Sequence, residues 1–396
     1  MKKDSNLKNL KTLNLKTFLP PVTTIFITIP WFHPAYRAGG PVQSIANMVN
    51  ELAEGYEFYI FCGNTDLNNI YLENIKTGQW IPYNDHTKVW YSVSYKRSEI
   101  LLQQMEKTCP DFVYITGLFS WHFNIVPLLF GKFTSAIVSV RGMLHPGALA
   151  QKKIKKQLFL QLFKLTRKHK KLIFHATDKI EKLHIENVFG QERIISVAGN
   201  FPRLLQPSCK LTKQAGLLKL VSLALISPMK NHLLVLQALA TCTATVQYEI
   251  YGPVKDMEYW QQCLQQIKKL PANIQVKYHA DVTPEQVVQV LHHSEVFILP
   301  SRSENFGHAI IEALSAGLPV ITSEYTPWNN LAAQRAGINV STGAGALAIA
   351  IHQFADMNET TFAQYRNGAI AYAHHAIDME AVKSQYRQMF ANAAGV

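Results

Sequence analysis

The sequence predicts an α/β fold in which two doubly wound parallel sheets face each other across a cleft. A chain of 396 residues is too long for one hydrophobic core and matches two domains of roughly 150 to 200 residues each. The composition is 48% hydrophobic and 17% charged, so the chain can bury large cores. Short β-branched or aromatic runs alternate with longer helical patterns, and this alternation predicts parallel sheets with helices on both faces.

The predicted elements form two series separated by a linker. The first series of strands lies at 24–29, 58–62, 88–93, 112–116, 136–140, 171–175 and 194–197, and the second at 219–226, 246–251, 274–278, 296–299 and 319–323. Helices are predicted at 43–53, 232–241, 257–269, 284–293 and 307–316. Residues 199–216 are polar and contain Pro202 and Pro207, which indicates a linker. Ligands of such sheets bind at the carboxyl ends of the strands, so we expect the site in the cleft.

Positive charge is concentrated in the first half of the chain. Residues 1–210 hold 27 Lys and Arg against 14 Asp and Glu, whereas residues 211–396 hold 12 against 13. In the densest cluster, 151–171, nine basic residues surround four apolar ones at helical spacing, Ile154, Leu158, Leu162 and Leu165. This pattern predicts a basic amphipathic helix whose apolar stripe either packs on its own domain or meets an anionic membrane surface or acceptor. No helix-turn-helix, zinc-finger or aromatic RNA-binding signature accompanies it, so we expect no nucleic-acid partner.

The sequence predicts a cytoplasmic protein without a membrane span. Its longest apolar runs fall short of the roughly 18 to 20 residues that a spanning helix needs, and the N-terminal segment lacks a signal-peptide cleavage pattern. The five cysteines are odd in number, widely spaced and free of any C-x-x-C pair. This usage predicts reduced thiols rather than disulfides or a zinc site.

One segment, 299–323, carries most of the information on function. It follows a predicted strand, turns through polar residues and Gly307, forms a helix and enters the next strand. Glu304 and Glu312 are eight positions apart, which is about 12 Å in a helix. That distance suits a nucleotide-sugar, with one carboxylate on sugar hydroxyls, the other on ribose hydroxyls, and the amides of 305–307 facing the diphosphate. A helix-capping acid and a solvated acid would give the same pattern in isolation.

One further turn could hold a phosphate, and one histidine could contact the same ligand. Lys230 lies in a tight turn between a predicted strand and a predicted helix, where its ammonium and the helix amides would converge on one anion. A surface lysine without a partner would look the same. His308, at the start of its helix, is a candidate sugar or phosphate contact.

Motifs along the chain resemble those of family 4 retaining glycosyltransferases. The donor-site motif of that family is matched by Ser303-Glu304-Asn305-Phe306-Gly307, followed by 312–314, 317–320 and 326–328. Upstream, the resemblance includes 33–41, 141–144, 226–231 and 251–253. It covers nearly the whole chain, from about residue 22 to 390, and its specificity lies mainly in 219–328.

The resemblance implies a GT-B fold, with two Rossmann-like domains on either side of a donor cleft. An acceptor-side domain would span 20–205 and a nucleotide-sugar domain 206–377, and the last helix, within 378–396, would pack back on the first domain. By motif position, Glu304 and Lys230 would be catalytic, contacting the transferred sugar and the diphosphate. The loop at Gly39 and Gly40 would approach the phosphates from the opposite wall, although an ordinary strand-to-helix turn fits these glycines equally well. The donor-binding and acceptor-side residues would be Gly39, Gly40, Gly252, Arg302, Asn305, Phe306, Gly307, His308 and Glu312 for the donor, and Arg141 for the acceptor.

The chain departs from the family pattern at Leu225, where the family usually has an arginine five residues before the lysine. Half of the cationic clamp is therefore missing, and Arg302 or Arg141 would have to replace it across the cleft. The D-x-D signature of metal-dependent glycosyltransferases is absent. We therefore expect no metal and no cofactor, with Lys230 and helix amides stabilising the leaving group.

The function implied by the resemblance is retaining transfer of a sugar from a nucleoside-diphosphate donor, expected to be a UDP-sugar. The acceptor would be a glycan or a polyprenyl-linked molecule in cell-surface polysaccharide biosynthesis. The basic first half of the chain suggests an enzyme that is cytoplasmic, or peripheral on the inner face of the cytoplasmic membrane. The alternatives are a sugar-nucleotide epimerase or a phosphorylase of the same architecture, or a non-catalytic basic protein of the membrane surface.

Overall fold

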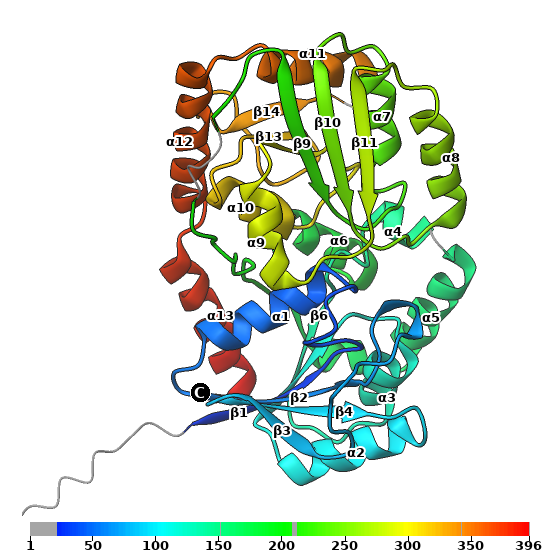
Figure 1. The fold of residues 1–396 in the computed structure, drawn as a ribbon. Coiled ribbons are helices and arrows are strands. Elements are labelled where there is room, and N and C mark those ends of the chain that lie inside the picture. Colours follow the sequence, from blue (N-terminus) through cyan, green and yellow to red (C-terminus); the bar gives the residue numbers. More distant parts are fainter. Residues whose placement is uncertain (1–21, 151, 208–211, 342, 396) are drawn as a thin grey trace, which may run out of the picture.

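Two sheets divide the chain into an N-terminal and a C-terminal α/β domain, one stacked on the other (Figure 1). The computed structural model describes residues 22–150, 152–207, 212–341 and 343–395. Parallel pairing dominates both sheets, so the predicted fold class of two parallel-sheet α/β domains is confirmed.

The N-terminal sheet has eight strands among the described residues, in the order β3-β4-β2-β1-β5-β6-β7-β8. Their bounds are β1 (Thr23–Thr28), β2 (Tyr56–Gly63), β3 (Trp80–Asn84), β4 (Thr87–Ser92), β5 (Phe112–Thr116), β6 (Ala136–Ser139), β7 (Ile173–Ala176) and β8 (Ile194–Val197). Strands β3 and β4 pair antiparallel, and the other pairs are parallel. The sequence does not predict β3, because Pro82 interrupts its strand pattern. A proline is tolerated there because β3 lies at the edge of the sheet.

The C-terminal sheet has six parallel strands in the described part of the chain, in the order β11-β10-β9-β12-β13-β14. Their bounds are β9 (Leu217–Leu223), β10 (Thr245–Tyr251), β11 (Ile274–His279), β12 (Val296–Leu299), β13 (Val320–Ser323) and β14 (Gly337–Val340). Strand β9 ends earlier than predicted, and Ile226 forms an isolated bridge with Val254 instead. The sequence also misses β14, because four residues that include a glycine give too short a pattern.

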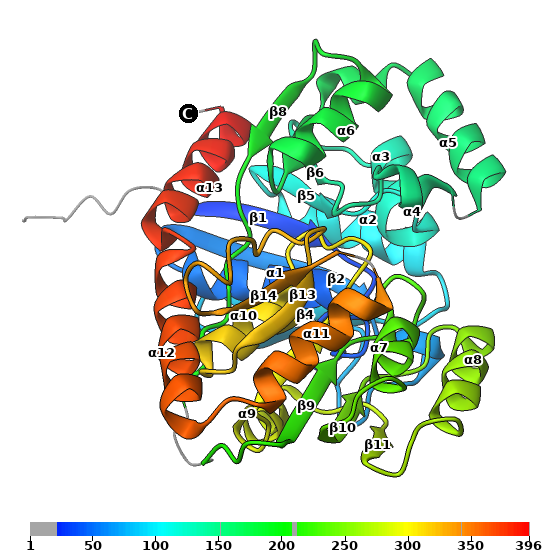
Figure 2. The same cartoon turned by 90° about the horizontal axis from the view of Figure 1, so that it is seen from above.

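Helices cover both faces of each sheet (Figures 1 and 2). In the N-terminal domain they are α1 (Gly40–Glu51), α2 (Arg97–Thr108), α3 (Val126–Phe130), α4 (Pro146–Ala150), α5 (Lys153–Leu165) and α6 (Lys179–Phe189). The C-terminal part contributes α7 (His232–Leu239), α8 (Met257–Ile267), α9 (Pro284–His292), α10 (His308–Ser315), α11 (Ala344–Ala355), α12 (Glu359–His375) and α13 (Met379–Ala394). Side-chain caps start several of them, for example Asp178 on α6 and Asp256 on α8.

Each sheet separates two hydrophobic clusters. In β1, Ile25 and Ile27 belong to one cluster and Phe26 to the other, because successive side chains of a strand point to opposite faces. All residues of β5 and β6 are buried, as expected for central parallel strands that are covered on both faces.

The chain crosses between the domains twice. The linker crosses first, where Asn47 Nδ2 donates to the Phe201 carbonyl at 2.8 Å and the Leu205 N–H donates to Ser315 Oγ at 2.9 Å. The second crossing runs from α12 to α13 along one side of both domains (Figure 2). Helix α12 packs on the C-terminal core, whereas α13 packs on the N-terminal core through Val382, Tyr386, Met389, Phe390 and Ala393.

The apolar stripe of α5 faces solvent. Ile154 is 82% exposed, Leu158 55%, Leu162 54% and Leu165 78%. The helix packs on its domain through its opposite face, where Leu160 and Phe163 are buried. The interpretation that this stripe packs on its own domain is therefore wrong, because periodicity marks an apolar face without showing that it is the one that packs.

No helix in the described part of the chain is both long enough and apolar enough to cross a bilayer.

Replacing Phe390 with alanine should lower the free energy of unfolding by about 3 to 5 kcal/mol, because its ring is fully buried against Tyr56, Phe112 and Tyr114. Urea denaturation followed by circular dichroism measures the change. The matched control, Ile349→Ala on the exposed face of α11, should cost less than about 1 kcal/mol. A similarly small effect at Phe390 would mean that α13 does not complete the N-terminal core.

Candidate active site

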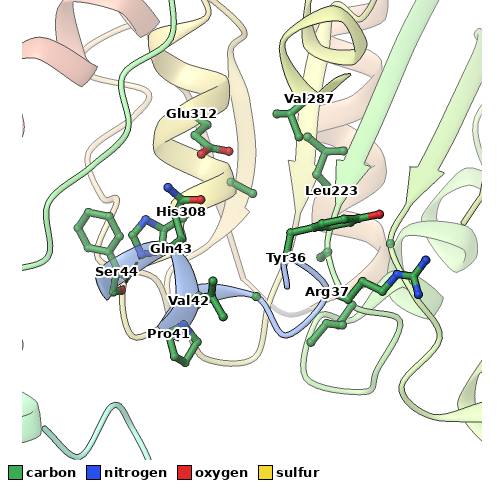
Figure 3. Close-up of a pocket in the computed structure, with 18 of the residues that line it drawn as sticks. Tyr36, Arg37, Pro41, Val42, Gln43, Ser44, Leu223, Val287, His308 and Glu312 are labelled. Atoms are coloured by element: carbon green, nitrogen blue, oxygen red, sulfur yellow. Dashed lines mark hydrogen bonds between the residues drawn. The ribbon is translucent and has the colours of Figure 1, made fainter. Parts of the chain in front are cut away.

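A cleft of about 390 Å³ lies between the two domains. In the N-terminal sheet the strand order reverses between β1 and β5, and in the C-terminal sheet between β9 and β12. Loops that leave such neighbouring strands diverge and make room for a ligand. The cleft is lined on one side by the loop before α1 and the first turn of α1, and on the other by the segments after β9, β10 and β12 and by the start of α10 (Figure 3).

The two expected catalytic residues meet in this cleft. Lys230 Nζ lies 2.5 Å from Glu304 Oε1, and Ser301 Oγ donates to the same oxygen at 2.7 Å. The side chain of Glu304 is 8% exposed and that of Lys230 is 24% exposed. Glu304 is therefore a largely buried carboxylate whose charge is balanced by Lys230, not a solvated surface acid.

The turn before α10 depends on Gly307. Its φ of 78° is left-handed, and an added Cβ would lie 3.2 Å from Trp328 Nε1. That indole nitrogen donates to the Phe306 carbonyl at 2.5 Å and fixes the turn. Asn305 contacts the other domain, since its Oδ1 lies 3.0 Å from Thr177 Oγ1. The turn thus brings the start of α10 against both the cleft and the N-terminal domain.

His308, the first residue of α10, also bridges the domains. Its Nε2 lies 2.9 Å from Ser44 Oγ in α1, and no described residue pairs with its buried Nδ1. Burial, together with the positive charges of Arg141 and Lys230, lowers the pKa of His308 to about 3. The imidazole is therefore neutral near pH 7, and its Nδ1 is available to a ligand.

Glu312 lies one turn further along α10, on the same face as His308 (Figure 3). Burial raises the pKa of Glu312 to about 7, and the positive charge of Arg203 acts in the opposite direction. Arg203 belongs to the interdomain linker, and its Nη2 donates to the Pro284 carbonyl at 3.2 Å. The charge of Glu312 near neutral pH is thus set by its depth in the cleft and by a cation from the linker.

The start of α1 approaches the start of α10. Gly39 is the N-cap of α1 with a φ of 79°, and no side chain caps this helix. A Cβ added to Gly40 would lie 3.8 Å from His308 Cδ2. Two helix N-termini therefore converge in the cleft, and the partial positive charge at each of them favours an anion there.

Arg141 lines the cleft from the N-terminal domain. Its guanidinium donates to Asn200 Oδ1 and, at 3.1 Å, to Tyr114 Oη, whereas its buried Nε meets no partner among the described residues. Burial opposes its charge, but the neighbouring Tyr114, Tyr386 and Glu181 keep the pKa of Arg141 above its usual range. Arg141 is thus a fixed positive charge at the wall of the cleft.

Two of the candidate donor-binding residues are placed differently from the others. Arg302 is exposed and is not among the residues lining the cleft, and its backbone N–H donates to the Met229 carbonyl at 2.8 Å. Gly252 lines the cleft, but with a φ of 141° an added Cβ would overlap the carbonyl oxygen of Ala224. A glycine is therefore required there for backbone packing. Leu225 also lines the cleft and leaves an apolar surface where the resemblance implies an arginine.

Sequence reasoning missed the side chains that join the two domains beside the cleft. Tyr36 Oη and Arg37 Nε each lie 2.5 Å from Asp281 Oδ2, and Arg203 acts on Glu312. The sequence analysis identifies the segments that contain them, the glycine-rich loop and the linker. It does not show which side chains reach across, because that depends on how the domains face each other.

The C-terminal domain matches a known family by sequence. Residues 209–371 match the model of the family described as glycosyl transferases group 1. No curated protein sequence matches the chain at a significant level.

Solved structures of low sequence identity share the fold over nearly the whole chain. Sucrose-phosphate synthase from Thermosynechococcus elongatus has a TM-score of 0.72 and 16% identity, over 93% of this chain and 100% of that chain. Anabaena HepE in complex with UDP-glucose has a TM-score of 0.67 and 14% identity, over 93% and 99%. A TarM variant from S. aureus, in complex with fondaparinux, alpha-GlcNAc-glycerol and UDP, has a TM-score of 0.67 and 11% identity, over 93% and 99%. The GT-B fold and the resemblance to group 1 glycosyltransferases are confirmed, and the assignment to family 4 stays a prediction.

Glu312→Gln should stabilise the protein relative to the wild type increasingly as the pH rises from about 5 to about 8. Because burial raises the pKa of Glu312 from 4.5 to about 7, the folded chain binds more protons than the unfolded chain between these values. Through that window the wild type loses stability as the pH rises, because the carboxyl of the unfolded chain ionises while the buried one resists ionisation. Above the window the penalty is constant, and glutamine removes it. Differential scanning calorimetry of both proteins across the pH range gives the difference in Tm. The exposed control, Glu54→Gln, should give no such trend, and a pH-independent difference at Glu312 would contradict the raised pKa.

Proposed function

We propose that this group 1 glycosyltransferase transfers a sugar, with retention, from a UDP-sugar to a hydroxyl of a glycan or a polyprenyl-linked acceptor. The observation that carries the proposal is the Lys230–Glu304 pair in a cleft where two helix N-termini converge. The structures of HepE with UDP-glucose and of TarM with UDP share this fold, which supports a uridine nucleotide as the donor.

In the proposed complex, the donor runs from Glu304 to Glu312 along the start of α10. The diphosphate lies between the starts of α1 and α10, where Lys230 and helix amides attract negative charge. The transferred sugar contacts Glu304, and the ribose hydroxyls bond to Glu312, a buried carboxyl that lines the cleft. The imidazole of His308 is neutral, and the role of its Nδ1 depends on the tautomer. When Nδ1 carries the hydrogen, it donates to a phosphate or sugar oxygen, and in the other tautomer it accepts from a sugar hydroxyl.

The proposed reaction is a single displacement on one face of the sugar. The bond from the sugar C1 to the diphosphate oxygen breaks, the bond from the acceptor oxygen to C1 forms, and the acceptor proton passes to the departing diphosphate. We favour this path over a covalent glycosyl-enzyme because Glu304 already accepts hydrogen bonds from Lys230 and Ser301, which weakens it as a nucleophile. Lys230 and the helix amides supply the charge stabilisation that the leaving group needs, so no metal or cofactor is included.

We further propose that α5 binds the anionic inner face of the cytoplasmic membrane, where a polyprenyl-linked acceptor for cell-surface polysaccharide would lie. The exposed apolar stripe of α5 is flanked by exposed lysines. Trp121 is 58% exposed and Phe130 60% exposed. Both lie in the segment 119–130, which contacts α5 through the rings of Phe119 and Phe159 and the turn after α5 through Lys168. Basic residues beside exposed aliphatic and aromatic side chains are typical of helices that lie in a membrane interface.

Lys230→Ala should lower kcat/KM by at least about 100-fold, equivalent to roughly 2.7 kcal/mol, because the leaving group loses the ammonium that stabilises it. A screen of UDP-sugars by nucleotide release first identifies the donor, and kcat/KM is then measured for wild type and variant. Lys230→Arg should recover part of the loss. Proton NMR of the product reports the anomeric configuration, and the rate in the presence of EDTA tests metal independence.

Lys268→Ala is the matched control, because Lys268 is exposed at the end of α8 and does not line the cleft. It should leave kcat/KM unchanged. The Tm of each variant is measured as well, since Lys230→Ala leaves Glu304 without its counter-charge. A folded Lys230→Ala enzyme with undiminished activity would exclude Lys230 from the phosphate site, and inversion of the product would refute the retaining mechanism.

The protein should sediment with vesicles of phosphatidylglycerol and phosphatidylcholine at low salt, and charge reversal of Lys153, Lys155 and Lys164 should abolish the binding. Each basic residue near an anionic surface contributes about 1 kcal/mol. Binding should fall as the salt concentration rises, because the Debye length shrinks. We choose these lysines because they are exposed beside the apolar stripe. Lys156 is left out because its Nζ donates a hydrogen bond to the Ala148 carbonyl at 2.6 Å.

Charge reversal of Lys268 and Lys269, two exposed lysines that directly follow α8, is the control for a general loss of positive charge and should reduce binding much less. Equal binding to neutral and anionic vesicles would contradict the electrostatic part of the proposal. Unchanged binding after reversal of the α5 lysines would show that another surface is responsible.

A further inference from the structure

We propose that Tyr36 forms one wall of the nucleobase subsite and that Asp281 is the positioning residue that holds it there. The base subsite would then be complete only when the two domains are closed on each other. This inference rests on the proposed function, because it assigns a part of the donor site.

Asp281 joins the two domains at the edge of the cleft. Tyr36 Oη and Arg37 Nε both donate to Asp281 Oδ2, each at 2.5 Å. Tyr36 and Arg37 lie in the loop between β1 and α1 of the N-terminal domain, whereas Asp281 lies between β11 and α9 of the C-terminal domain. Burial alone would raise the pKa of Asp281, but the hydrogen bonds from Tyr36 and Arg37 hold it below its usual value, so the group is a carboxylate. Two donors on one charged oxygen make this a strong contact between the domains.

The loop that carries Tyr36 is also anchored in its own domain. The Arg37 N–H donates to Asp66 Oδ2 at 3.0 Å, and the hydroxyl of Tyr91 donates to the His33 carbonyl. The Gly39 N–H closes a turn on the Tyr36 carbonyl at 3.2 Å. Because the loop is held at both of its ends, the direction of the Tyr36 side chain is set by the loop and by Asp281 together.

The surroundings of Tyr36 suit a flat aromatic ligand. Leu223, Val282, Pro284 and Val287 line the cleft and are all apolar, and Val282 directly follows Asp281 in the chain. Figure 3 shows the Tyr36 ring beside Leu223 and Val287, across the cavity from His308. An aromatic ring added to an aliphatic pocket provides a stacking surface, which accepts any base because every base has a π-face.

The position of this apolar pocket agrees with that of the proposed ribose contact. Glu312 lines the same cavity, so a nucleoside whose ribose bonds to Glu312 has its base within reach of this pocket. The polar end of the cleft, at Lys230 and the helix N-termini, is then left to the diphosphate. Tyr36 therefore contributes to binding of the base and not to binding of the phosphates.

Calorimetry with UDP and with inorganic pyrophosphate tests this assignment. Tyr36→Ala should weaken UDP binding about 10- to 100-fold, in the range measured for base–aromatic stacking, and should leave pyrophosphate binding unchanged. Tyr36→Phe keeps the ring and should lose less than Tyr36→Ala. Asp281→Ala should weaken UDP binding as well, and the double variant should lose less than the sum of the two, because both changes act on one contact. Tyr95→Ala, at a tyrosine that is 72% exposed and does not line the cleft, is the matched control and should bind UDP as the wild type does.

Wild-type affinity for UDP in a folded Tyr36→Ala variant would overturn the assignment, as would an equal loss for UDP and pyrophosphate. Additive losses in the double variant would overturn the positioning role of Asp281. These outcomes leave the proposed function intact, because the wild type still binds the nucleotide. If the wild type binds none of UDP, ADP and GDP, the proposed function fails and this inference fails with it.

Discussion

The ion pair between Lys230 and Glu304 is the interaction on which the site depends. The two charged groups lie 2.5 Å apart, and the carboxylate is 8% exposed, so neither group could remain charged in the cleft at low cost without the other. The pair also holds an ammonium next to the start of α10, where helix amides already favour an anion. An anion that binds Lys230 does not leave Glu304 without a partner, because Ser301 still donates to the same carboxylate oxygen. A bound diphosphate can therefore take the place of Glu304 as the counter-charge of Lys230.

The cleft is a product of both domains and not of either alone. Among the residues that the structure describes, polar contacts cross it at three places. Each joins the N-terminal domain to the start of a C-terminal helix or to the turn before one: Ser44 to His308, Thr177 to Asn305, and Tyr36 with Arg37 to Asp281. The linker and α13 hold the domains together on another side of the molecule. A chain that crosses twice limits how the domains can move, so opening of the cleft would break these polar contacts before it disturbs either core.

The fold class and most strands are predictable from sequence because central strands buried on both faces read as continuous apolar runs. Strands 112–116 and 296–299 are of this kind and have the predicted bounds. Strand β3 is not predictable, since it contains a proline and pairs at an edge. The motifs predict that Lys230, Glu304, His308 and Glu312 lie in one cleft. They do not predict which side chains these residues contact there. Lys230 and Glu304 are 74 positions apart, and Ser44 and His308 are 264 apart, so no local pattern records these contacts. Packing between distant segments also decides the orientation of α5. Periodicity identifies its apolar stripe, but only the packing of Leu160 and Phe163 shows that the stripe faces outward.

Because position 225 is a leucine, a second cation for the diphosphate has to come from another part of the cleft. Arg302 follows β12 but its side chain is exposed away from the lining, whereas Arg141 lines the cleft. Arg141 is held by Asn200 and Tyr114, and its charge acts on His308 strongly enough to contribute to the lowered pKa of that imidazole. A charge that affects the first residue of α10 also acts on an anion bound at that helix start. Because Arg141 belongs to the N-terminal domain, its effect on a bound diphosphate depends on the distance between the domains. The leucine at position 225 therefore makes the contribution of a second cation, like the proposed completion of the base subsite, depend on how closely the two domains approach each other.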